Sequence, residues 1–594
     1  MAEPATLPRW DLTSVLPAVG DPEFDEAFAR ATAEVTRLGR LFDERGVGPS
    51  AGSISPAAFD EVLGEFLRVR TDVYQFEAYL ECLTAADSRD DPAQARLSAL
   101  QPSLAALSIL QTRLSAWVGS SDVETLLAAS AAAREHEHFL RQSVVRARHL
   151  MSPAEEDLAA HLVLTGSTAW EKLHANLTSL IVVPLEVEGE VRSLPMSAVR
   201  NLAQHADRAL RRRAYEAEQA AWSAARVPLA AAMNSIKGEV NLLARRRGWE
   251  SPLEATLFEH ALDRPILEAM TTAVADSFPD FHRYLRAKAR ALGLDSLAWF
   301  DLYAPLGDPG GAWSFERARA FIEDHFGSFS PLLLDTARRA FAEAWIDAEP
   351  RQGKVGGAFC MWIRQGESRV LANFVPTYSG MSTLAHELGH AYHNRTRAGR
   401  SILQRRTPST LAETASIFCE TLVGDAAYQA AGAAERLSIL ESFLQTACAV
   451  VVDIAGRFRF EQWVFERRQE RELSPDELCG LMLEAHRQTY GDGLDPSTYH
   501  PYMWAVKPHY YSGSASFYNY PYTFGLLFGL GLFAIYRESS NGFAERYEDL
   551  LSRTGMATAA DLARDFGLDL RTPGFWRASL DMIRERIARF EALV

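Results

Sequence analysis

The chain carries the stretch TLAHELGHAYH at residues 383–393. If this stretch is helical, His386 and His390 lie one turn apart on the same face, so both imidazoles can reach a single metal ion. Glu387, one step round the helix, can then reach a water on that metal. The alternative is an ordinary buried helix that contains two histidines. The H-E-x-x-H pattern is typical of zinc peptidases, and it sets the first hypothesis for this chain.

The residues around this pattern favour a metal site. Ser382 is expected to start the helix, and Gly389 leaves room for a close approach by another element. A metzincin would place Gly at position 393 and His at position 396, but the chain has His393 and Thr396. The third ligand must therefore come from elsewhere in the chain.

Zinc in a catalytic site takes three protein ligands and keeps one position open. The residues from Ser409 to Glu420 read as one uninterrupted helix, with a start signal at residues 407–409. Glu413 and Glu420 lie seven residues apart, on one face, which in most helices is simply solvated. Beside a metal site that lacks a ligand, we take Glu413 as the third ligand. Glu420 and His393 are expected to lie next to the metal ligands without binding the metal. Glu420 is expected to orient a ligand histidine.

The H-E-x-x-H pattern and the two spaced glutamates resemble the motifs of a known family. The segments 386–390 and 413–420 are similar to those of the M3 metallopeptidases, in particular the oligoendopeptidase F branch. Many M3 relatives have Pro where this chain has Ala415, a difference that this branch tolerates. Other segments are similar across nearly the whole chain: Trp10–Leu12, Gly166–Trp170, Asp301–Leu306, Gly353–Cys360 and Pro508–Tyr520.

The resemblance implies a mainly α, two-lobed, prolate molecule with a deep central channel and zinc on its floor. Such a channel admits short unstructured peptides and excludes folded proteins. We expect residues 1–200 to form an N-terminal helical lobe or lid with a small hairpin. Residues 201–594 are expected to form the catalytic helical domain with the zinc site.

The spacing of apolar residues supports this helical organisation. Strand-like alternation at residues 181–194 predicts a small hairpin. A second hairpin is predicted from residues 358–364 and 369–375, just before the H-E-x-x-H helix, as a small β-ribbon beside it. Helices are predicted at residues 22–42, 56–83, 92–118, 121–146 and 197–246.

The second hairpin has two interpretations. In the first, an extended substrate peptide pairs with the edge of the strand that precedes the metal helix. In the second, this strand only supports the helix. The resemblance favours substrate binding, with Gly356, Gly357 and Ala358 next to the peptide.

Seven of the 18 tyrosines lie between Tyr499 and Tyr522, together with His500 and His509. Aromatic clusters are most often core. A peptidase also needs donors for the oxyanion that forms during attack on the peptide bond. The resemblance assigns this task to His509 and Tyr520, and it suggests Tyr511 and Tyr518 as further substrate contacts.

The resulting hypothesis is an endopeptidase for short oligopeptides with one Zn²⁺ per chain, held by His386, His390 and Glu413. Glu387 acts as general base and then delivers the proton to the leaving amine. One alternative is a dipeptidyl carboxypeptidase, which adds a cationic group for the substrate's terminal carboxylate. The other is a catalytically silent peptide-binding protein.

The composition of the chain limits which partners and which cellular compartment can be expected. The net charge of −16 argues against nucleic acid or an anionic membrane as a partner. Five scattered cysteines, without a C-x-x-C pair, read as reduced thiols. Residues 1–17 lack a secretory h-region, and the apolar run Phe524–Tyr536 is too short to span a bilayer. We therefore expect a soluble, cytoplasmic protein, either a monomer or a homodimer.

Overall fold

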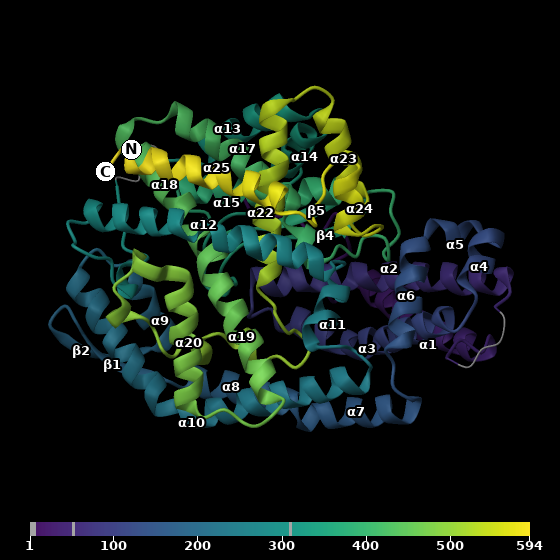
Figure 1. Cartoon of the computed structure of the whole chain (residues 1–594). Coiled ribbons are helices and arrows are strands. Elements are labelled where there is room, and N and C mark those ends of the chain that lie inside the picture. Colours follow the sequence, from purple (N-terminus) through teal and green to yellow (C-terminus); the bar gives the residue numbers. More distant parts are fainter. Residues whose placement is uncertain (1–6, 50–53, 308–311) are drawn as a thin grey trace. The chain divides into compact units, whose positions relative to one another are not determined.

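The computed structural model describes residues 7–49, 54–307 and 312–594. Helices make up most of this part of the chain, and its strands are few and short (Figure 1). The predicted mainly α class is confirmed. The chain forms two compact units, each assembled from three stretches of sequence. The first unit is Met1–His149, Gly311–Ala426 and Ile535–Phe566, and the second is Leu150–Gly310, Ala427–Ala534 and Gly567–Val594.

The boundary predicted at residue 200, between an N-terminal lobe or lid and the catalytic domain, stays a prediction. The two compact units follow a different division. Residues 150–200 belong with the second unit, and residues 311–426 and 535–566 belong with the first.

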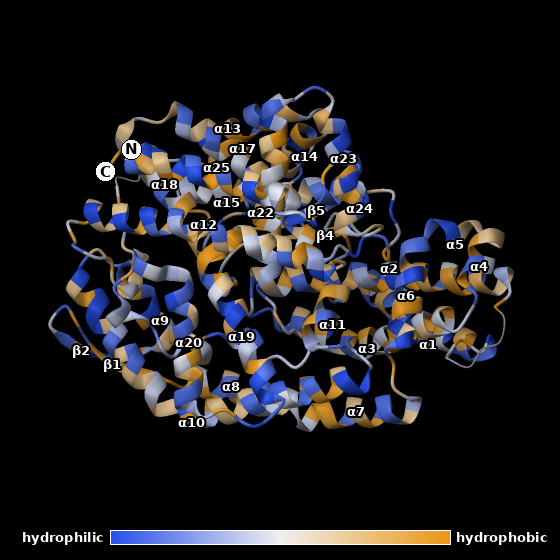
Figure 2. Ribbon diagram, in the orientation of Figure 1, coloured by the Kyte–Doolittle hydropathy of each residue, from blue (hydrophilic) through white to orange (hydrophobic). Residues whose placement is uncertain are grey.

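The first unit has an apolar core formed by its N-terminal helices, in which Phe24, Phe59 and Phe66 are fully buried. These helices are amphipathic, and Figure 2 shows apolar and polar residues along the same ribbons. The helices of this unit are α1 (Pro22–Glu44), α2 (Pro56–Ala86), α3 (Asp91–Gly119), α4 (Val123–Ala129), α5 (Ala131–Glu135), α6 (Glu137–Arg148), α13 (Phe315–Phe329), α14 (Pro331–Ala342), α15 (Tyr378–Thr396), α16 (Ser409–Ala412), most of α17 (Thr414–Ala430), α23 (Phe543–Ser552) and α24 (Ala559–Arg564).

The single helix predicted at residues 121–146 is wrong. The structure has α4, α5 and α6 there, because side chains that favour helix ends interrupt the run. Asp122 accepts a hydrogen bond from the backbone N–H of Glu124, and Ser130 accepts one from that of Ala133. Each side chain satisfies an otherwise unpaired donor of a new helix, so both residues start helices.

The predicted second hairpin is present. Strands β4 (Phe359–Arg364) and β5 (Glu367–Leu371) are antiparallel, and Gly366 in their turn has a φ of 74°. A third strand, β3 (Ile346–Asp347), pairs in parallel with β5 and was not predicted. The order is β3-β5-β4, so the strand that precedes the H-E-x-x-H helix is paired on both sides. The expected free edge therefore belongs to β4, not to β5.

The second unit has its own apolar core, which includes Trp222, Met233 and Trp504. The predicted hairpin at residues 181–194 is confirmed as β1 (Val182–Val187) and β2 (Glu190–Pro195), joined by a turn with positive φ at Glu188 and Gly189. The α-helices of this unit are α7 (Pro153–Thr165), α8 (Ser167–Ser179), α9 (Met196–Asn201), α10 (Arg208–Arg246), α11 (Pro252–Glu259), α12 (Arg264–Ala291), α18 (Ala433–Cys448), α19 (Ile454–Arg468), α20 (Pro475–Tyr490), α21 (Met503–Val506), most of α22 (Tyr520–Glu538) and α25 (Pro573–Glu591).

One helical stretch among the described residues, Glu435–Arg468, has the length and composition of a membrane span. Its most apolar window is 56% buried inside the protein, and buried core helices share these properties. The run Phe524–Tyr536 lies within α22, where Phe524, Phe528 and Leu530 are fully buried.

Candidate active site

The H-E-x-x-H stretch is helical, as predicted, and lies in the middle of α15. The helix begins at Tyr378, because the Thr377 side chain accepts a hydrogen bond from the Gly380 N–H. Ser382 therefore does not start the helix, which corrects that prediction. The rings of His386 and His390 are 5.0 Å apart between centroids, on one face of the helix.

The proposed third ligand comes from a helix that breaks at that residue. α16 ends at Ala412 and α17 begins at Thr414, so the prediction of one uninterrupted helix is wrong at Glu413. Its backbone has φ −88° and ψ 2°. Oε2 of Glu413 lies 3.2 Å from Nε2 of His386 and 3.4 Å from Nε2 of His390.

These three side chains fit a zinc ion. Ligand bonds of 2.0–2.2 Å in a tetrahedron separate neighbouring donor atoms by about 3.4 Å. The carboxylate oxygen of Glu413 stands at nearly that distance from both imidazoles, and all three donor atoms lie within 4.8 Å of one another. Two nitrogens and one oxygen are also a donor set that suits zinc.

Gly389 allows the two helices of the site to cross closely. A Cβ at this position would stand 2.7 Å from Cα of Ser416 and 2.8 Å from the carbonyl oxygen of Ala415. Both atoms are backbone atoms that follow Glu413. The approach expected at Gly389 is therefore made by α17, and it brings the third donor to the histidines.

Glu420 lies against the first histidine. Its Oε2 is 3.1 Å from Nδ1 of His386, and its Oε1 accepts a hydrogen bond of 3.1 Å from Ser382. This contact fixes the ring so that Nε2 faces Glu413. Ser416 plays a matching part, because its hydroxyl donates to Oε2 of Glu413 at 2.7 Å. The sequence analysis missed the roles of both serines, although the E-x-x-S spacing at Glu413 places the two side chains one turn apart.

Replacement of Glu420 by Ala tests this orientation. We expect the metal affinity to fall about 10- to 100-fold, because outer carboxylates raise the basicity of ligand imidazoles and fix their rings. Competition with a coloured chelator measures the affinity. Glu316→Ala is a matched control at an exposed glutamate of the same unit, and it should leave the affinity unchanged. An unchanged affinity in Glu420→Ala would remove this role.

Neighbouring charges shift the pKa values of His386 and Glu413 in opposite directions. Burial by itself lowers the pKa of His386, but the hydrogen bonds and charges of Glu413 and Glu420 outweigh it and raise the pKa to about 10. Burial raises the pKa of Glu413, and the two imidazoles reverse this and hold it far below its ordinary value.

Glu387 is buried, and its Oε2 has no hydrogen-bond partner among the described residues. Burial raises the pKa of its carboxyl group, and the imidazoles of His386 and His390 oppose that shift only in part. A carboxylate with a raised pKa beside a metal site has the properties of a general base.

Two further groups of predicted residues lie in the first unit. His393 is buried, with Nε2 2.8 Å from the hydroxyl of Thr554, and burial lowers its pKa well below the ordinary value. Gly356 and Gly357 are exposed, and a Cβ at either would meet open space. Gly357 has a φ of 82°, and Ala358 follows it just before β4 begins at Phe359. The outer strand β4 already accepts one hydrogen bond, from Tyr74 to the carbonyl of Trp362.

His509 lies in the second unit, in the short 3₁₀ helix Pro508–Tyr511. Burial, helped by the positive charges of Arg457, Lys507 and Lys237, lowers the pKa of His509 to about 3. Its imidazole is therefore neutral at pH 7 and can donate a hydrogen bond without adding charge. The ring stacks on Tyr518, with centroids 5.9 Å apart.

The predicted tyrosines of the second unit have different surroundings. Tyr520 is buried, and its hydroxyl lies 2.9 Å from Nδ1 of His260. Tyr518 is 46% exposed, and its hydroxyl is 2.9 Å from that of Tyr522. Tyr511 is fully buried and stacks on a histidine of α8, and its assignment as a substrate contact stays a prediction.

Comparison with known families agrees with this fold. Residues 325–582 match the model of peptidase family M3, and residues 118–181 match the model described as Oligopeptidase F. The first match contains the whole His386, His390 and Glu413 group. Fold, site and family model together define a metallopeptidase.

Relatives and solved structures indicate which kind of metallopeptidase the chain resembles. The group B oligopeptidase PepB of Streptococcus agalactiae is 24% identical over 80% of both chains. The oligopeptidase PepF of Bacillus subtilis is 22% identical over 77% of this chain and 69% of its own. The crystal structure of oligoendopeptidase-F from Enterococcus faecium has the same fold, with a TM-score of 0.70, 18% identity and coverage of 96% of this chain and 99% of that one. A structure from Chlamydophila abortus reaches a TM-score of 0.84 with 19% identity, over 99% and 98% of the two chains. The chain belongs to peptidase family M3, in its oligoendopeptidase F branch.

Proposed function

We propose that the protein is a zinc-dependent endopeptidase that hydrolyses internal bonds of short, unstructured peptides. The observation that carries this proposal is the donor geometry of His386, His390 and Glu413, with the buried carboxylate of Glu387 on the same helix. The names of the relatives, which include oligoendopeptidases, support oligopeptides as the substrate class.

In this proposal Glu387 takes the proton of the attacking water and passes it to the leaving amine. When bound, Zn²⁺ supplies a Lewis acid that polarises the scissile carbonyl and lowers the pKa of water. Glu420 keeps His386 in the tautomer whose Nε2 is free to bind the metal. His509 and Tyr520 remain the proposed donors to the oxyanion, and the neutral imidazole of His509 suits that task.

We also propose that the protein acts in the cytoplasm. Its five cysteines are free thiols, as a reducing compartment requires.

The test is cleavage of peptides whose two ends are blocked by acetyl and amide groups. We expect mass spectrometry to find internal cleavage, a metal chelator to abolish it, and added Zn²⁺ to restore it. Cleavage only of peptides with a free C-terminus, with release of dipeptides, would replace the proposal by a dipeptidyl carboxypeptidase. Binding of zinc and peptide without any cleavage would replace it by a peptide-binding protein.

A further inference from the structure

The segment Gly166–Trp170 has no part in the site described above, although it is one of the segments that resemble the family. The structure places it at the start of α8, where Gly166 precedes the first helical residue. Glu239 of α10 accepts two hydrogen bonds from Ser167, one from its backbone N–H at 2.9 Å and one from its hydroxyl at 2.5 Å. A Cβ at Gly166 would stand 2.1 Å from Oε2 of Glu239. A carboxylate from another helix therefore caps α8.

The same serine touches the segment that follows His509. A Cβ at Gly513 would stand 2.3 Å from Oγ of Ser167 and 2.5 Å from its Cβ. Gly513 does not have a positive φ, so the contact with Ser167, and not the backbone conformation, requires glycine there.

Two turns further along α8, a second contact reaches the same segment. The ring of His174 stacks on Tyr511 with centroids 3.8 Å apart. Its Nε2 donates to the carbonyl oxygen of Ala505 at 2.9 Å. Residues 167 and 174 lie on one face of the helix, so α8 contacts the segment at both points.

The far end of the segment is also held. Arg457 of α19 is hydrogen-bonded to Asp453 and donates to Oδ1 of Asn519 at 3.3 Å. Phe517 has a φ of 53°, a conformation that costs energy for a bulky residue and persists only where packing imposes it. Its ring packs against Phe458 and Phe465, each with centroids 5.3 Å apart. Tyr518 follows this strained residue.

From these contacts we propose that Ser167 and Glu239 form a latch on Gly513 that positions residues 509–518 for substrate binding. Both are positioning residues, which act through the segment that carries His509 and Tyr518. The inference rests on the proposed peptidase function, because that function assigns substrate contacts to this segment.

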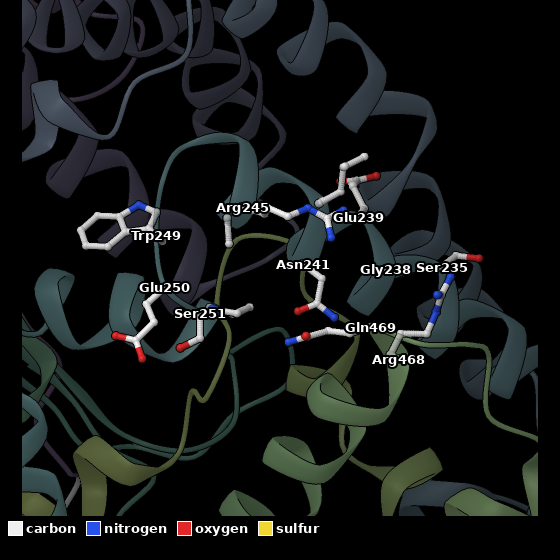
Figure 3. A pocket seen from close by; sticks show the side chains of 13 residues that line it. Ser235, Gly238, Glu239, Asn241, Arg245, Trp249, Glu250, Ser251, Arg468 and Gln469 are labelled. Atoms are coloured by element: carbon white, nitrogen blue, oxygen red, sulfur yellow. The ribbon is translucent and has the colours of Figure 1, made fainter.

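Glu239 also borders a cavity of about 270 Å³ between α10, the start of α11 and the end of α19. Figure 3 shows Glu239 on α10, near Gly238 and Arg245 in the wall of this cavity. Its substitution therefore leaves no void in a closed core, and Glu239→Gln is a suitable conservative variant beside Glu239→Ala.

The central test is a compensating pair of substitutions. Gly513→Ala places its Cβ against the Ser167 side chain and should lower kcat/KM about 10- to 100-fold, because small displacements of positioned groups cost that much. Ser167→Gly removes both clashing atoms, so the double variant should return to the activity of Ser167→Gly alone. Gly480→Ala is the control in the same unit, since its Cβ meets open space. Glu239→Ala should lower activity more than Glu239→Gln does.

A second measurement does not depend on activity. Hydrogen exchange of the amides of residues 512–519 should become faster in Gly513→Ala and return to the rate of Ser167→Gly in the double variant, while the unfolding temperature of all variants stays similar. Full activity of Gly513→Ala, or a double variant less active than Ser167→Gly, would overturn the latch. If the native chain cleaves no peptide, the proposed function fails, and the exchange measurement still decides on the latch.

Discussion

We expect Glu387→Gln to lower kcat about 100- to 10,000-fold, which is the usual contribution of a general acid–base residue, and to leave the metal bound. The substitution keeps the shape of the side chain and removes only its ability to take a proton. Because Oε2 of Glu387 has no hydrogen-bond partner among the described residues, the amide disrupts no contact there. Steady-state kinetics on a blocked peptide, together with the zinc content of the purified variant, measures both effects.

Two outcomes would contradict this role. Near-normal turnover in Glu387→Gln would show that another group takes the proton. Loss of zinc from the variant would show that Glu387 acts by holding the metal, and the kinetic loss would then say nothing about proton transfer.

Gly389→Ala is expected to lower the zinc affinity at least about tenfold. This is the size of effect that follows when a carboxylate hydrogen-bonded to a metal ligand is removed. The new methyl group would meet backbone atoms of Ala415 and Ser416, which no change of rotamer can move away. α17 must therefore shift, and the carboxylate of Glu413 leaves its position beside the two imidazoles. Overpacking of this kind also costs about 1–3 kcal/mol of folding stability.

Zinc competition and thermal unfolding measure the two consequences of Gly389→Ala. Gly399→Ala is the matched control, because it lies just after the same helix and its Cβ would meet open space. A Gly389→Ala protein with normal zinc affinity would mean that the close crossing of α15 and α17 is not what sets the position of Glu413.

The sequence by itself indicated most of the residues of the candidate metal site. The four-residue spacing of His386 and His390 fixes them on one helical face, whatever surrounds that helix. The missing third ligand and the helical pattern of residues 409–420 then indicated Glu413, and the structure brings its carboxylate within 3.4 Å of both imidazoles. The mainly α class and both hairpins could also be predicted, since they depend on local periodicity and turn residues.

Sequence reasoning was less accurate where local signals compete. The break at Glu413 interrupts a run that reads as one continuous helix. Serine is a residue type that often starts helices, which led to the prediction for Ser382. In the structure Thr377 caps α15, and Ser382 donates a hydrogen bond to Glu420. Strand β3 has only two residues, so it carries no periodicity that could be recognised.

Only the tertiary structure decided which distant residues share a contact. The need for glycine at position 389 depends on the backbone of α17, and the need for glycine at position 513 depends on Ser167, 346 positions earlier in the chain. Such requirements arise where two elements approach more closely than a methyl group allows. A linear sequence records the glycine, but it does not record the partner that makes it necessary.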